Sequence, residues 1–421
     1  MAGVLVTEDS NAPPELELDE VPLALDFHPT ANNVLAVGSI DGSVRVSRFT
    51  CDAHEPAFLV ATPFDSSAGG VRSVRFSQDG QVLWAGAADH SIVGLSPTGA
   101  LAWRNPTAHR DAVSKVTLID EHLIGSGDDS GAVKVWDARQ APERPVMAFD
   151  LFQDYVSDLL VDQVHHPGTL LGTSGDGTLA AFDLRQHTCL GRSNDLEEDL
   201  LSVQVVKGGR KVVCGTSEGV LLLFSWDNWD GATDSFPGHP ESVGALLKVD
   251  ESTILTGSSD GMVRVVGLMP SKLYGLVGDH QGFPLERMAW SSDRNLLGTI
   301  SHDPTVRFWD VTYLHEDDEE GDGEEMAEEA GAADAGAMGD QTSAELLRHI
   351  RARQEAAAAA GGGGADDDGW EDEDESGADE MSGSDSDEDS DGPGASGGGA
   401  RTAKGKKAQY RTPAQSFFQD L

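Results

Sequence analysis

Cysteine is scarce in this chain, and its three cysteines, Cys51, Cys189 and Cys214, lie far apart in the sequence. None of them belongs to a Cys-x-x-Cys pair, which excludes a zinc ribbon and a dithiol redox motif. The odd number argues against a secreted scaffold held by disulfides, so we expect a reducing, intracellular compartment. The sequence also lacks a His-Glu-x-x-His motif, and it predicts neither a metal ion nor a cofactor.

Long apolar runs and basic residues are also few. No stretch approaches the roughly 18 apolar residues of a membrane span, and the first 20 residues do not resemble a signal peptide. The 29 Lys and Arg residues face 73 Asp and Glu residues, which leaves a net charge of −44. Because such a surface repels phosphates, we expect no direct binding to nucleic acid and no membrane partner.

The 49 glycines, in contrast, recur in a regular pattern. Seven segments contain small residues, then an acidic residue, a turn former and alternating apolar positions, at spacings of 41 to 48 residues. The acidic position is occupied by Asp41, Asp89, Ser130, Asp176, Glu218, Asp260 and Asp303. This is the period of a four-stranded blade, with Asp-Gly at the hairpin turn. The sequence therefore predicts an all-β fold, a seven-bladed WD-repeat β-propeller over residues 21–315, monomeric within its complexes.

The seventh repeat is one strand short, because the chain turns acidic soon after Val311. We expect the N-terminal segment, residues 1–20, to supply the closing strand, and we place that strand within residues 4–20. An open ring would leave an unpaired strand edge.

Histidines precede the acidic position by about 21 to 23 residues in three repeats, at His109, His239 and His280. In WD-repeat proteins such a histidine joins the turn Asp, a strand Ser or Thr and a Trp in a buried hydrogen-bonded chain. The seventh repeat offers the fullest set, His280, Ser301, Asp303 and Trp309. The third repeat departs from the pattern, because Ser130 replaces the acid.

Residues 316–421 are rich in Glu, Asp, Ala, Gly and Ser, and from His315 onward 30 acidic residues face 8 basic ones. This composition predicts a disordered acidic tail. Within it we expect a short helix at 343–360. The basic cluster at 404–407 is a candidate nuclear import signal, and the aromatic end, with Phe417, Phe418 and Leu421, a candidate partner-binding motif.

Two Gly-x-Ser-x-Gly motifs, at Ser217 and Ser259, raise the alternative of a hydrolase. A nucleophile elbow must join a strand to a helix. Both motifs lie instead at the same phase of the repeat, in a predicted hairpin. We therefore expect no catalytic residue.

Several segments go beyond the generic repeat: 26–29, 36–42, 126–139, 173–179, 209–216 and 222–226. Over residues 21–314 the chain resembles the WD repeat-containing protein 55 family. The resemblance implies a nuclear, often nucleolar, protein that acts with ribosome-assembly factors in ribosomal RNA production. It implies as an alternative a substrate receptor of a cullin-RING ubiquitin ligase, since some plant relatives are linked to such ligases.

The ligase alternative depends on Trp-Asp-x-Arg motifs, which contact the ligase adaptor in receptors of this kind. The third repeat has Trp136, Asp137 and Arg139, and the fourth has Asp183 and Arg185 after a Phe in place of Trp. Each arginine is otherwise expected to pair with a nearby acid, an exposed contact that contributes little to stability.

Overall fold

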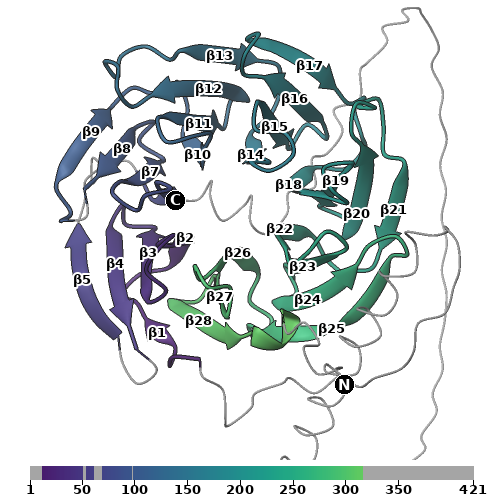
Figure 1. Cartoon of the computed structure of the whole chain (residues 1–421). Coiled ribbons are helices and arrows are strands. Elements are labelled where there is room, and N and C mark those ends of the chain that lie inside the picture. Colours follow the sequence, from purple (N-terminus) through teal and green to yellow (C-terminus); the bar gives the residue numbers. More distant parts are fainter. Residues whose placement is uncertain (1–11, 51–53, 61–68, 97, 316–421) are drawn as a thin grey trace, which may run out of the picture. The chain divides into compact units, whose positions relative to one another are not determined.

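The computed structural model describes residues 12–50, 54–60, 69–96 and 98–315, and only the backbone of 54–60. Within these ranges, 28 strands form seven four-stranded antiparallel sheets arranged as a ring (Figure 1). The predicted seven-bladed propeller is confirmed. The predicted tail, its helix at 343–360 and the terminal Phe417, Phe418 and Leu421 lie outside the described residues.

Each of the first six blades takes four consecutive strands, from the centre of the ring outward. Blade 1 comprises β2 (Pro22–Phe27), β3 (Val34–Ser39), β4 (Val44–Phe49) and β5 (His54–Val60). Blade 2 comprises β6 (Val71–Phe76), β7 (Leu83–Ala87), β8 (Ile92–Leu95) and β9 (Leu101–Asn105). Blade 3 comprises β10 (Val113–Leu118), β11 (Leu123–Asp128), β12 (Ala132–Asp137) and β13 (Met147–Asp150). Blade 4 comprises β14 (Val156–Val161), β15 (Thr169–Ser174), β16 (Leu179–Asp183) and β17 (Thr188–Arg192). Blade 5 comprises β18 (Leu200–Val206), β19 (Lys211–Thr216), β20 (Val220–Ser225) and β21 (Asp234–Pro237). Blade 6 comprises β22 (Val243–Lys248), β23 (Thr253–Ser258), β24 (Met262–Gly267) and β25 (Lys272–Asp279).

The seventh blade combines the two ends of the described chain. It contains β26 (Leu285–Trp290), β27 (Leu296–Ser301) and β28 (Thr305–Asp310), followed by the short 3-10 helix η1 (Thr312–Leu314). Its outer strand is β1 (Leu16–Glu17), which pairs antiparallel with β28. The Leu18 amide extends this contact by donating to the Pro304 carbonyl at 2.8 Å. The strand that closes the ring thus lies within residues 4–20, as the sequence predicts.

Apolar side chains from neighbouring blades form the core between them. Trp84 and Ile92 of blade 2 pack with Val113, Ile124 and Trp136 of blade 3 in one buried cluster. At Gly127 of β11, an added Cβ would lie 2.5 Å from the Val156 side chain of the next blade. The small residues before each turn therefore let adjacent blades approach closely, as the repeat pattern predicts.

Leu16 links the closing strand to the interface between the first and last blades. Its side chain is 3% exposed, and it belongs to a buried cluster with Phe27 and Phe49 of blade 1 and Phe308 of blade 7. The three aromatic rings lie 5.3 to 6.3 Å apart, centroid to centroid. This interface joins the two ends of the repeat array.

A charge at Leu16 is expected to weaken the closure. Leu16→Asp removes about 2 kcal/mol of apolar burial and places a carboxylate in that cluster, which lowers Tm by roughly 5 °C or more. The matched control is Glu17→Gln on the exposed side of the same strand, which should melt as the wild type does. A Leu16→Asp variant with wild-type thermal unfolding would contradict the closure by β1.

Candidate partner-binding face

The turns that carry Arg139 and Arg185 lie on one face of the ring, in neighbouring blades. Each follows the third strand of its blade and contacts the turn between the first two strands. The Ala138 amide donates to the His122 carbonyl at 2.8 Å, and the Leu184 amide donates to the Gly168 carbonyl at 3.0 Å. Asp128 and the turn after it lie at the other end of the strands. We call the side with the two arginines the Asp-x-Arg face.

Arg139 is engaged by the acid of its own motif. Its Nε donates to Oδ1 of Asp137 and its Nη2 to Oδ2, both at 2.9 Å. These hydrogen bonds hold the pKa of the Asp137 carboxyl well below its usual range. The Arg139 side chain is nevertheless 62% exposed, so a partner can reach it. Arg139 therefore pairs with a nearby acid, as the sequence predicts for arginines at this position.

Arg185 differs from Arg139. Oδ1 of Asp183 accepts hydrogen bonds from the backbone amides of Arg185, at 2.7 Å, and Gln186, at 2.9 Å. These amides, that of Gln186 first, lower the pKa of the Asp183 carboxyl. The exposed Arg185 guanidinium makes no hydrogen bond or ion pair within the described residues, and its Nε lies over Gly168. Asp183 thus orders the turn and leaves the cation available.

Val164 adds an apolar side chain to the Asp-x-Arg face, in the turn between β14 and β15. It is 80% exposed, more than any other large apolar side chain among the described residues. The turn is held by an Asp162–His165 contact of 2.8 Å and by His166, whose ring stacks on Trp226 at 3.5 Å. Val164 was not among the residues predicted from the sequence, although its position as an apolar residue between polar turn residues was an available signal.

The complete buried network occurs in blade 3 rather than blade 7. His109 Nδ1 contacts Asp128 Oδ2 at 2.8 Å, and its Nε2 contacts Ser126 Oγ at 2.6 Å. The Trp136 indole donates to the same hydroxyl at 2.8 Å. Asp128 also accepts hydrogen bonds from the amides of Ser130 and Ala132. The third repeat therefore departs from the pattern only in position, because its acid stands two residues before the expected one.

The network predicted for blade 7 was wrong in two respects: Ser301 is not part of it, and Asp303 makes no hydrogen bond to His280. His280 Nε2 and the Trp309 indole both contact Thr299 Oγ1, at 2.7 and 2.8 Å, and not Ser301. Ser301 instead donates to Asp303 at 2.8 Å, since it lies two residues further along β27 than Thr299. Asp303 Oδ1 stays 4.0 Å from His280 Nδ1, which has no hydrogen-bond partner within the described residues.

Blade 6 has a shorter version of the same network. His239 Nε2 contacts Thr256 Oγ1 at 2.8 Å, and its Nδ1 lacks a partner in the described part of the chain. Val266 occupies the position that corresponds to the tryptophan. Burial lowers the pKa of His239 to about 4 and that of His280 to about 4, and the nearby Arg264 and Arg307 add to the respective effects. Burial also lowers the pKa of His109, against the opposing effect of Asp128.

The serines of the Gly-x-Ser-x-Gly motifs lie in hairpins. Ser217 stands between β19 and β20, and Ser259 between β23 and β24. Neither turn joins a strand to a helix.

The structure describes no cluster of three or more metal-ligating side chains in residues 12–315, outside the gaps given above. Within the same residues, no helix has the length and apolar character needed to span a membrane.

Comparisons with known proteins agree with this architecture. The WDR55 family model matches residues 13–314. WD repeat-containing protein 55 of Homo sapiens is 35% identical over 309 residues, which cover 73% of this chain and 79% of the human one. The Arabidopsis thaliana protein of the same name is 36% identical over 304 residues, 72% of this chain and 84% of that one. A chain in the "Crystal Structure of Mitotic Checkpoint Complex" shares the fold, with a TM-score of 0.62 at 17% identity, over 74% of this chain and 95% of that one.

The depressed histidine pKa values predict how stability depends on pH. In the unfolded chain the imidazoles of His239 and His280 gain protons near pH 6.5, whereas in the folded protein they stay neutral down to a pKa of about 4. The free energy of unfolding is therefore highest above pH 6.5 and falls as the pH drops, by about 1.4 kcal/mol per unit for each such histidine. Denaturant unfolding between pH 6.5 and 5 measures this slope, above the range in which most carboxylates titrate.

The control is the double variant His239→Gln and His280→Gln. Glutamine hydrogen-bonds to Thr256 and Thr299 but does not titrate, so the slope should lose about 1.4 kcal/mol per pH unit for each of the two histidines replaced. An unchanged slope would show that these histidines are not buried neutral groups.

Proposed function

Because this chain belongs to the WDR55 family, we propose that it is a non-catalytic protein-interaction scaffold in ribosome biogenesis. The observation that carries the proposal is the family match over residues 13–314, which covers the whole propeller. The family resemblance noted in the sequence implies ribosomal RNA production and processing, with ribosome-assembly factors as partners. It implies the nucleolus as the place of action, within the nucleus.

Two features of the molecule support a scaffold rather than an enzyme. The hydrolase-like serines are in hairpin turns, where small and polar residues serve the blade geometry. The face with Arg139 and Arg185 combines exposed cations with the apolar Val164, a mixture suited to a protein partner. The net charge of −44 supports protein partners over RNA.

Depletion of this protein from its cells is expected to raise the level of precursor ribosomal RNA relative to the mature species, because assembly stalls without the scaffold. Northern blotting or sequencing of precursor species measures the change. Re-expression of the wild-type chain should restore the ratio, which serves as the control for off-target effects. Unchanged precursor levels after efficient depletion would refute the ribosomal role.

A second function, substrate receptor of a cullin-RING ligase, is favoured by one specific observation. Arg185 presents an exposed guanidinium that no described residue engages, on a turn ordered by Asp183. Arg139 lies at the equivalent position of the neighbouring blade. Two exposed arginines at the same phase of adjacent blades offer a ligase adaptor a paired contact.

The variant Arg139→Ala with Arg185→Ala tests that contact, and we expect it to lose adaptor capture by about tenfold or more. Of the single changes, Arg185→Ala should have the larger effect, because Asp137 already satisfies the Arg139 guanidinium. Arg104→Ala, at an exposed position of the outer strand β9, is the control and should bind as the wild type does. Wild-type capture by the double variant would exclude this mode of ligase binding.

A further inference from the structure

The centre of the ring carries the opposite charge to the rest of the molecule. The seven innermost strands line a cavity there, and its charged residues are Arg72, Arg75, Lys115, Asp158 and Arg287. Four cations and one carboxylate thus line it, in a chain whose net charge is −44. A basic lining inside an acidic protein points to an anionic ligand.

Three of these cations already have a partner, and the fourth does not. The ion pairs are Arg72–Asp129 at 2.6 Å, Arg75–Asp26 at 3.2 Å and Lys115–Asp158 at 2.7 Å. Arg287 makes no hydrogen bond or ion pair with any described residue. The cavity therefore has one guanidinium without a hydrogen bond or ion pair among the described residues, although Arg287 is near enough to Asp158 to help lower the pKa of its carboxyl.

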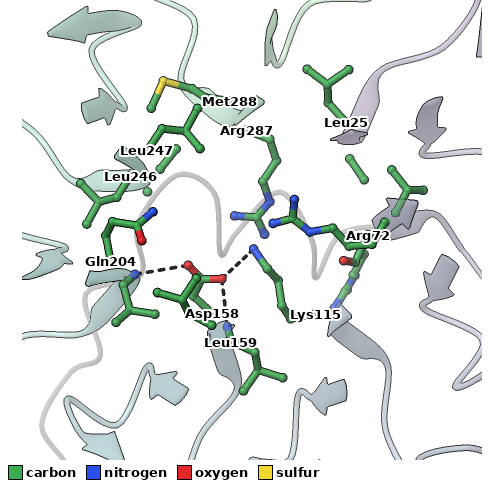
Figure 2. A pocket seen from close by; sticks show the side chains of 18 residues that line it. Leu25, Arg72, Lys115, Asp158, Leu159, Gln204, Leu246, Leu247, Arg287 and Met288 are labelled. Carbon is green, nitrogen blue, oxygen red and sulfur yellow. Dashed lines mark hydrogen bonds and ion pairs between the residues drawn. The ribbon is translucent and has the colours of Figure 1, made fainter. Parts of the chain in front are cut away.

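The register of the strands brings this cation to the Lys115–Asp158 pair. Lys115, Asp158 and Arg287 each follow the irregularity near the start of their inner strand, so they lie at the same height in the ring. Arg287 belongs to blade 7, three blades away from blade 4, and reaches in from across the cavity. Figure 2 shows Arg287 and Lys115 pointing into the same space beside Asp158.

Lys115 is buried between the Asp158 carboxylate and the other cations of the cavity. Its side chain is 8% exposed, and burial lowers its pKa to about 8. Arg287 and Arg75 lower this pKa further, while Asp158 opposes them. An anion placed between Lys115 and Arg287 would relieve this repulsion.

Gln204 adds a neutral donor to the same wall. Its Oε1 accepts a hydrogen bond from the Val205 amide at 3.1 Å, and its side-chain NH₂ makes no hydrogen bond to any described residue. The remaining lining is largely apolar, with Leu25, Leu159, Leu246 and Met288 around the charged centre. The cavity thus offers a guanidinium and an amide donor within apolar walls.

We propose that this cavity binds one acidic side chain, Asp or Glu, of a partner protein, with its carboxylate paired to Arg287. One carboxylate matches the single unpaired cation, and a guanidinium binds it through two parallel hydrogen bonds. The apolar walls match the methylene groups and neighbours of such a side chain, which a free inorganic anion lacks. This inference rests on the proposed role as a protein-binding scaffold and gives that scaffold a partner class.

The test uses the full chain and a fluorescent synthetic peptide rich in Glu and Asp, with a sequence that does not occur in this chain. The control peptide is the same sequence with every Glu replaced by Gln and every Asp replaced by Asn. We expect saturable anisotropy changes with the acidic peptide alone. Arg287→Gln should weaken its binding by about tenfold or more, the loss expected for one charged pair. Arg104→Gln, the same charge change on the outer strand β9, should leave binding unchanged.

A second variant guards against a folding defect. Arg287→Lys keeps the charge but loses the fork of donors, so its affinity should fall between those of the wild type and Arg287→Gln. Thermal unfolding of each variant checks that the ring is intact. Equal binding by wild type and Arg287→Gln would overturn the proposal, as would no saturable binding up to about 1 mM peptide, the weak limit of a specific contact.

Inorganic phosphate, titrated at constant ionic strength, separates a free anion from a peptide. Displacement of the peptide by phosphate at equal or lower concentration would overturn the assignment to an acidic side chain. If the peptide does not bind but depletion of the protein still changes the level of precursor ribosomal RNA, only the inference about the central cavity is refuted. Peptide binding with unchanged precursor levels would remove only the ribosomal role.

Discussion

Closure of the ring is the constraint on which the rest of this structure depends. A four-stranded blade cannot bury both of its apolar faces alone, so every blade requires a neighbour on each side. Blade 7 obtains its outer strand from Leu16–Glu17, and Leu16 packs with Phe27 and Phe308 across the joint. Because closure fixes the seven innermost strands around one axis, residues from distant blades meet at the centre of the ring. For the same reason, equivalent turns of neighbouring blades lie on the same face.

Much of the fold was predictable from the sequence because its signals are local. The turn Asp-Gly pairs and the alternating apolar positions set the phase of each blade, and closeness of blades requires small residues such as Gly127. The members of the buried networks were less predictable. Asp128 replaces the acid expected at position 130, and Thr299 replaces Ser301, because a shift of two residues keeps a side chain on the same face of a strand. A pattern of residue types does not distinguish these positions.

The candidate sites were predictable in part, for a similar reason. The Asp-x-Arg ends are local motifs, yet only the structure distinguishes Arg139, held by Asp137, from Arg185, which has no such partner among the described residues. Arg287 and Lys115 are far apart in the sequence and carry no shared motif. They come together only because the ring closes, so a surplus of positive charge inside an acidic protein has no signal in the sequence alone.

Hydrogen exchange at the Leu18 amide tests the closure most directly. This amide donates to the Pro304 carbonyl at 2.8 Å, and no pairing other than that between the two ends of the described chain protects it. If β1 closes the ring, its exchange should be slowed by several orders of magnitude relative to an unstructured peptide. Exchange at the rate of an unstructured peptide, with the β27 amides still protected, would contradict the account.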